Sequence, residues 1–377
     1  MENAAVLSVA GLCLGIALSG LLAVAARKGS LRERLSLGIF YLAFVGLITL
    51  PIVKISATEM LLNYMPLLLV CLLVLPPALY HHIAARTAKA AQAHIPKRDL
   101  ILPLAGGLVC IGFWILPAQA KTLMFISGEL PAGVLPAMLA LLTFALIVIW
   151  LVASFAYLVA ILRSLRAYRA RIRQLYSDIE TRDLRWVDVV MGLLVLIWGV
   201  GALSLADENF SDGTLVSDTL LLALIAGGLL VINVFAPLTP PDQNGDAKED
   251  APDLKYARSA LKSDLAEKLT ARVETAMQKD RLYLDPNLSL QKLSTHVGAL
   301  PNHVSQILNQ HIGASFFDYV SRCRIEASKP QIIAGDVSVL TVALDVGFNS
   351  RSAFYKAFKR ETGMTPKTYR AAQHHLG

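Results

Sequence analysis

Long apolar runs fill the first part of the chain, and short amphipathic stretches fill the last part. A helix rises about 1.5 Å per residue, so about 20 apolar residues cross the roughly 30 Å hydrocarbon layer of a membrane. Prolines within two of the runs are compatible with crossing, because neighbouring groups can satisfy the freed carbonyls. Seven runs are long enough, and the pattern predicts a seven-helix transmembrane domain over residues 1–237, with spans at 4–26, 35–53, 60–80, 100–120, 134–162, 187–206 and 215–236.

Basic residues are distributed unevenly among the loops between these predicted spans. The loops after the first, third and fifth spans hold 15 Lys and Arg residues, whereas the opposite loops hold only Lys54 and Lys121. Loops rich in Lys and Arg stay on the cytoplasmic side. We therefore expect a multi-pass protein of the bacterial cytoplasmic (inner) membrane, with its N-terminus outside and its C-terminus in the cytoplasm. No basic residue precedes the first run, which favours a retained anchor over a cleaved signal.

Composition changes sharply along the chain. Hydrophobic residues make up 55% of it and charged residues 17%, with a net charge of +7, which excludes disorder and an ordinary cytosolic enzyme as descriptions of the whole. Residues 1–237 hold 17 basic and 13 acidic residues, whereas the much shorter 253–377 holds 17 and 11. Between them, residues 238–252 hold one Lys, four acids and several prolines. We interpret this stretch as an acidic, solvated linker that leads to a basic soluble domain.

The transmembrane part offers little catalytic chemistry. Its predicted spans are almost free of charge, whereas intramembrane ionisable residues are the usual mark of transport or proton relay. His81 and His82 follow the third span without Cys or carboxylates at ligand spacing, so we interpret them as polar surface, and no CxxC pair occurs. We expect no metal, no cofactor and no enzymatic activity.

The loop after the fifth span has two interpretations. Residues 162–185 predict a basic amphipathic helix that continues the span, with an apolar stripe at Leu162, Leu165, Ile172, Leu175 and Ile179. Its arginines could bind anionic lipid headgroups. Alternatively, its apolar stripe could contact the soluble domain or a second copy of the chain.

The soluble part begins with a predicted connecting helix at about 254–280, within residues 253–282. A short amphipathic helix over 288–298 then ends at a glycine, and Pro301 opens another, since proline is tolerated in the first turn. The second helix presents Val304, Ile307 and Leu308 inward and polar residues outward. Two short helices joined at a glycine-containing turn predict a helix-turn-helix unit.

The same pattern recurs near the C-terminus. An amphipathic helix ends at Gly347, and a helix from Ser350 to Arg360 follows, with Phe354 and Phe358 on its inward face. A predicted helix over 315–334 joins the two units and spans roughly 30 Å, close to the roughly 34 Å of one turn of B-DNA. Pro330 should kink this helix or end it early. We expect an all-α protein whose two reading helices enter successive major grooves of double-stranded DNA.

The stretch 347–370, GFNSRSAFYKAFKRETGMTPKTYR, resembles the signature of the AraC/XylS family of bacterial transcription regulators. The resemblance covers the paired units at about 284–371 and implies an AraC-type DNA-binding domain over 283–377. It also implies sequence-specific control of transcription, commonly with contact to RNA polymerase. Most of that family carries a soluble ligand-binding or dimerisation domain, where this chain has apolar spans.

The resemblance and the polar faces together give candidate DNA contacts. The residues expected to face bases are Asn302, Ser305 and Gln306 in the first unit and Arg351, Ser352, Tyr355 and Lys356 in the second. The residues expected to contact phosphates, which position the protein without specifying sequence, are Lys359, Arg360, Lys367 and Arg370. Arg322 and Arg324 are expected to support the helix scaffold.

The main hypothesis is therefore a one-component regulator whose membrane domain senses a signal and alters the state of its DNA reader. The loops predicted to lie outside are short, so the signal would be a small lipophilic ligand or a membrane protein partner, and a homodimer is plausible. Two alternatives stay open. The membrane part could be a transporter or membrane enzyme with an appended regulatory domain, or the spans could be a passive tether in the lipid bilayer.

Overall fold

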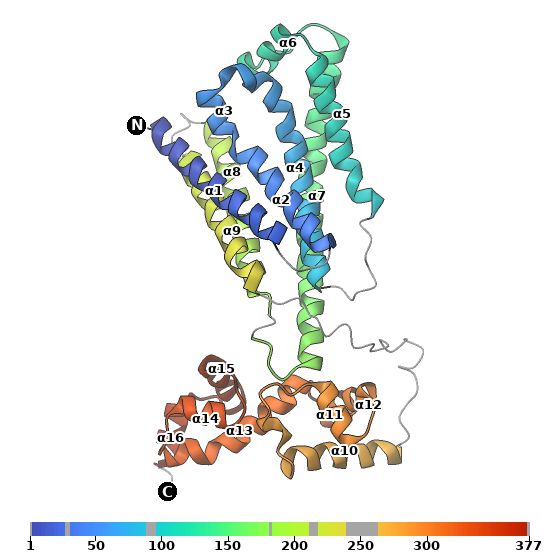
Figure 1. Cartoon of the computed structure of the whole chain (residues 1–377), viewed down its shortest axis with the longest axis vertical. Coiled ribbons are helices and arrows are strands. Elements are labelled where there is room, and N and C mark those ends of the chain that lie inside the picture. Colours follow the sequence, from blue (N-terminus) through green and yellow to red (C-terminus); the bar gives the residue numbers. More distant parts are fainter. Residues whose placement is uncertain are drawn as a thin grey trace. The chain divides into compact units, whose positions relative to one another are not determined.

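Helices form the regular elements of the described part of this computed structural model, which covers residues 2–26, 31–87, 96–180, 183–210, 218–238 and 263–374. The all-helical prediction is confirmed over these ranges. The chain divides into two compact units (Figure 1). The first unit holds Met1–Leu165 and Leu184–Gln243, and the second holds Arg166–Asp183 and Asn244–Gly377.

The first unit is built from long apolar helices. Within it, α2 packs against α1 and α4, α5 packs against α4, and α9 packs against α1 and α8. The described elements that begin in this unit are α1 (Glu2–Ala26), α2 (Leu31–Ile48), α3 (Leu50–Ser56), α4 (Thr58–Thr87), α5 (Ile101–Ile115), α6 (Ala118–Thr122), α7 (Val134–Leu175), α8 (Arg185–Phe210) and α9 (Asp218–Leu238).

Five helical segments of the described chain are long and apolar enough to cross a membrane: Ala4–Ala26, Leu31–Ser56, Thr58–Thr87, Lys97–Ile115 and Val134–Leu175. They coincide with the first five predicted runs. A shorter apolar helix, Thr219–Phe235, lies in the seventh run, and α8 covers the sixth. Five segments thus support membrane association. The predicted count of seven spans stays a prediction.

The second predicted run is divided into two helices. α2 ends at Ile48, and α3 carries Pro51 in its first turn, where the missing N–H costs little. The Thr49 hydroxyl donates a hydrogen bond to the Val45 carbonyl at 2.8 Å, and Tyr64 from α4 bonds the Gly46 carbonyl. Side-chain donors therefore serve carbonyls beside the break.

The interpretation of His81 and His82 as polar surface is wrong. α4 continues past residue 80 to Thr87, and both histidines are buried on it. His81 Nε2 lies 2.8 Å from Asp99 Oδ2, and Arg86 Nε donates to Glu33 Oε1 at 2.7 Å. Charged partners on neighbouring segments compensate the loss of water, which is the condition for burying such groups. The sequence pattern of one helix cannot show such partners.

The second unit has two hydrophobic cores that share one helix. α13 contributes Phe316 and Val320 to the first core, and Ile325 and Ile332 to the second. The early part of the predicted connecting helix lies outside the described residues. The helices of this unit are α10 (Ser263–Gln278), α11 (Leu290–Val297), α12 (Pro301–Ile307), α13 (Phe316–Ala334), α14 (Val339–Asp345), α15 (Arg351–Thr362) and α16 (Pro366–His374).

Pro330 does not end the joining helix early. α13 continues four residues beyond it to Ala334, and a left-handed Gly335 (φ 73°) then closes the helix. A proline removes one backbone donor, here the partner of the carbonyl four residues earlier. Ile332, buried in the second core beyond the proline, holds the last turn in place.

The helix predicted over 162–185 ends at Leu175 rather than continuing. Beyond Leu175, Tyr176 forms an isolated antiparallel bridge with Ser289. The Ser177 N–H donates to the Leu288 carbonyl at 3.2 Å. Pairing with another backbone replaces the helical bonds that Ser177 would have made, so the stretch belongs to the second unit.

Candidate nucleic-acid interface

The first helix-turn-helix unit consists of α11 and α12. Ser289 caps α11 by accepting the Lys292 N–H at 3.2 Å, and Gly298 ends α11 in the left-handed region (φ 66°). α12 begins at Pro301 and is followed by one wider turn, Leu308–Ile312. Val304, Ile307 and Leu308 are fully buried, as their spacing predicts.

Burial of that stripe turns the opposite side of α12 outward. Asn302 is exposed, and Ser305 and Gln306 are half-buried. The Asn309 side chain donates to the Ser305 carbonyl at 2.8 Å, and the Gln306 side chain donates to Gln310 at 3.0 Å. Residues spaced by three and four share one helix face. The three predicted base-facing residues of this unit therefore lie together on an uncharged polar face.

The second helix-turn-helix unit turns at a glycine with a positive φ. α14 ends at Asp345, and Gly347 adopts φ 91° within the turn to α15. A β-carbon at this position would lie 2.6 Å from the Tyr283 carbonyl oxygen and 2.8 Å from that of Leu284. Glycine is thus required both by the backbone conformation and by the close approach of the 283–284 backbone.

α15 is fixed by its cap and by an aromatic core. Ser350 accepts the Ala353 N–H at 3.0 Å, as favoured at a helix N-cap. Phe354 and Phe358 are fully buried, with ring centroids 5.5 Å apart. Phe348 from the turn and Tyr369 from α16 pack edge-on against them at 5.4 and 5.3 Å. The opposite face of α15 carries polar and charged residues instead.

The predicted base-facing residues of the second helix-turn-helix unit lie on that opposite face. Arg351, Ser352 and Lys356 are exposed, and Tyr355 is half-buried. The Arg351 guanidinium donates to the Tyr355 hydroxyl at 3.1 Å and lies 5.1 Å from its ring centroid. This contact restricts the Arg351 side chain to the face that Tyr355 shares, which reduces the ordering cost of a contact with a base edge.

The predicted phosphate contacts differ among themselves. Lys359 and Lys367 are exposed, whereas Arg370 is half-buried. Arg360 is already engaged: its guanidinium lies 3.3 Å from Asp318 and 5.3 Å from the Phe317 ring centroid, so it ties α15 to α13. Arg360 has a scaffold role that the sequence prediction did not include.

Arg324 holds three segments of the second unit together. Its side chain is 1% exposed, and its guanidinium donates to the Tyr283 carbonyl at 2.7 Å and the Asp285 carbonyl at 2.8 Å. The Arg324 guanidinium also lies 5.5 Å from the ring centroid of Phe348, which belongs to the turn between α14 and α15. Burial lowers the pKa of Arg324 to about 10, with nearby Asp178 and Asp285 opposing that shift. The guanidinium therefore stays charged at neutral pH.

Two further groups of this unit have shifted pKa values. Burial opposes ionisation of Asp285, but hydrogen bonds from the Lys292 side chain and the Asn287 N–H outweigh it, so the Asp285 pKa is lowered. Burial raises the pKa of the Cys323 thiol to about 11. Both shifts favour scaffold roles, because Asp285 is held by hydrogen bonds and Cys323 stays a neutral thiol.

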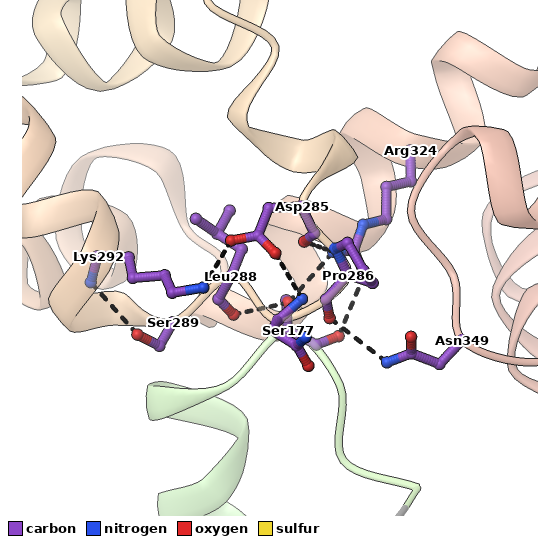
Figure 2. Close-up of polar contacts among 9 residues, drawn as sticks. Ser177, Asp285, Pro286, Leu288, Ser289, Lys292, Arg324 and Asn349 are labelled. Atoms are coloured by element: carbon purple, nitrogen blue, oxygen red, sulfur yellow. Dashed lines mark hydrogen bonds and ion pairs between the residues drawn. The ribbon is translucent and has the colours of Figure 1, made fainter.

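The docked loop, defined as Gln174–Glu180, contacts both helix-turn-helix units. These two units, within residues 263–374, are called the reader below. Figure 2 shows Ser177 beside Leu288 and Arg324. The Ser177 hydroxyl donates to the Leu288 carbonyl at 2.7 Å and lies 3.2 Å from an Arg324 nitrogen. The sequence prediction missed this role of Ser177. The apolar stripe alone gave a signal, and Leu175 from it does pack on the first core.

Metal chemistry finds no support in this part of the chain. Among residues that the structure describes, no cluster of three His, Cys, Asp or Glu side chains could hold an ion.

Comparison with known proteins finds a family that is similar to the paired units. Residues 293–372 match the family described as a helix-turn-helix domain. The match is to the C-terminal part of this chain. It accounts for α12 to α15 and extends from within α11 into α16.

Curated relatives match the same region. An HTH-type transcriptional regulator from Staphylococcus aureus (strain COL) is 35% identical over 89 residues, which are 24% of this chain and 12% of that protein. The regulatory protein PocR of Salmonella typhimurium is 29% identical over 101 residues, 26% of this chain and 33% of that protein. The chain therefore spans well under two thirds of the length of these relatives.

Among solved structures, the C-terminal domain of AraT, a response regulator from Geobacillus stearothermophilus, is 24% identical and covers 28% of this chain and 87% of its own length, with a TM-score of 0.26.

Proposed function

We propose that the chain is a membrane-embedded, sequence-specific DNA-binding transcription regulator of the AraC/XylS type. The observation that carries this proposal is the second helix-turn-helix unit. Its buried aromatic core leaves Arg351, Ser352 and Lys356 exposed on one face of α15. Arginine matches guanine edges in the major groove, and the uncharged face of α12 supplies Asn and Gln groups that match adenine.

The five membrane-length helices support an anchor for this reader. We propose seven spans, with α8 and α9 as the sixth and seventh, and with the N-terminus outside. The membrane domain would sense a lipophilic ligand or a membrane protein partner, and RNA polymerase and a second copy of the chain would be partners of the reader. A reporter fused after residue 237 should be active only as a cytoplasmic enzyme; activity as a periplasmic enzyme would contradict this topology.

DNA selection tests the proposed function directly. The full-length chain, reconstituted in lipid nanodiscs, is incubated with a pool of random-sequence duplexes at moderate salt, and bound DNA is amplified and sequenced. We expect a bipartite motif whose two parts lie about one helical turn apart, because α12 and α15 would read successive grooves. Failure to enrich any sequence over competitor DNA would refute the proposal.

Two substitutions separate base reading from phosphate contact. Arg351→Ala should lower affinity for the selected duplex by about 10–100-fold and relax preference at one base position. Lys367→Ala should weaken binding to all sequences about equally and make the salt dependence shallower by about one counterion. Binding isotherms at several salt concentrations would distinguish them. If Arg351→Ala lost the same affinity for the selected duplex and for random DNA, a base-reading role of Arg351 would be refuted.

A further inference from the structure

Carboxylates of the docked loop lie on the DNA-reading side of α15. Glu180 accepts a hydrogen bond from the Ser350 hydroxyl at 2.5 Å and one from the Ser352 hydroxyl at 3.2 Å. Its second contact with α15 is ionic, since the Lys356 Nζ lies 3.8 Å from Glu180 Oε1. Two of the four residues predicted to read bases in this unit are thus bound to an acidic side chain of the same chain.

Other residues of the docked loop contact both helix-turn-helix units. Asp178 accepts a hydrogen bond from the Asn349 amide at 2.5 Å, directly before α15. On the other side, the amides of Gln174 and Asn309 exchange hydrogen bonds at 3.1 and 3.3 Å, after α12. Figure 2 shows the centre of this arrangement, where Ser177 contacts the 285–288 segment and Arg324.

The docked loop presents acidic groups to α15, as DNA would. The N-terminus of a helix attracts anions, and DNA would present phosphates and base acceptors to the same end of α15. A carboxylate at Ser350, Ser352 and Lys356 uses the donors that DNA would use. Two acidic side chains would also be repelled by the phosphate backbone.

We infer that the docked loop is an autoinhibitory segment, whose Glu180 competes with DNA for α15 and must leave before the reader binds. This inference rests on the proposed DNA binding. The loop joins the ends of α7 and α8, two helices predicted to span the membrane, so a change in those helices has a covalent route to the reader. Apparent affinity for DNA then falls in proportion to the fraction of chains with the loop undocked.

The test compares charge-matched variants of the full-length chain in nanodiscs. Glu180→Gln removes the competing carboxylate and should bind the selected duplex about tenfold more tightly than the wild-type chain. Glu326→Gln is the control, because Glu326 is exposed and pairs with Lys329 one turn away on the same helix, α13. It removes the same charge from the same unit, and its affinity should change by less than about twofold.

An engineered disulfide between the docked loop and the reader should have the opposite effect, because it would hold the loop in place. Tyr176 and Ser289 face each other in an antiparallel bridge, a geometry that places Cα atoms about 4.5–5.5 Å apart, within the range of a disulfide. With the four native cysteines replaced by alanine, Tyr176→Cys with Ser289→Cys should lose about tenfold in DNA affinity when oxidised. Reductant should restore binding, and this reversal controls for misfolding.

The outcomes separate the two claims. If Glu180→Gln and wild-type bind the selected duplex equally, or if oxidised and reduced forms of the disulfide variant do, autoinhibition is refuted while the proposed function stands. If neither wild-type nor Glu180→Gln enriches any sequence, the proposed function itself fails, and the inference falls with it.

Discussion

Replacing Gly347 with alanine is expected to open the second helix-turn-helix unit. The new β-carbon would lie 2.6 and 2.8 Å from two backbone carbonyl oxygens, of Tyr283 and Leu284, and the backbone is already at φ 91°. Backbone atoms cannot move away as a flexible side chain can, so we expect a loss of about 3 kcal/mol or more in local stability. Amide hydrogen exchange in α14 and α15, followed by mass spectrometry of the full-length chain, should accelerate about 100-fold.

Gly363 provides the matched control. It also has a left-handed conformation, with φ 74°, but a β-carbon there would meet no atom within 4 Å. Gly363→Ala should therefore cost only the conformational strain, about 1 kcal/mol. Equal acceleration of exchange in the two variants would show that the approach of the 283–284 backbone is unimportant.

Replacing Arg324 with alanine should have the largest effect among the basic residues of the reader. The substitution removes donors from the carbonyls of Tyr283 and Asp285 and leaves a cavity where the guanidinium lay. Unpaired buried acceptors cost about 1–3 kcal/mol each, so we expect local stability to fall by about 4 kcal/mol. Hydrogen exchange should accelerate both in the 282–290 segment and in the docked loop.

Arg322, two residues earlier on the same helix, is the comparison. Its side chain is 51% exposed and its nearest carboxylate, of Glu361, is 4.0 Å away. Exposed pairs of this kind contribute about 0–1 kcal/mol, so Arg322→Ala should leave exchange nearly unchanged. A similar effect of both substitutions would mean that loss of positive charge, rather than of the three-segment contact, destabilises the reader.

The sequence predicted the two helix-turn-helix units well because their determinants are local. Burial of Phe354 and Phe358 follows from helical spacing, and the glycine at 347 follows from the turn between two amphipathic segments. Local patterns also placed the first five membrane-length helices. Each of these features depends on residues a few positions apart, which periodicity records.

The sequence could not predict features that depend on distant partners. The sequence analysis expected a scaffold role for Arg324 but not its partners, which are carbonyls about 40 residues earlier, and Ser177 leaves the helical pattern because Leu288 offers a backbone partner. His81 is buried beside Asp99, which comes after the next loop. Charge and amphipathicity alone suggested a headgroup-binding helix or a contact face for 162–185, and neither interpretation predicts a helix that ends at Leu175.

The docked loop holds the reader by hydrogen bonds, in addition to the covalent connection through the acidic linker. The chain passes between the two units after Leu165, before Leu184 and again beyond Gln243. A protease that cuts only the acidic linker would therefore leave the reader bound non-covalently to a segment whose two ends remain joined to the membrane part. Release of the reader would then require undocking as well as cleavage, so cleavage alone would not free it.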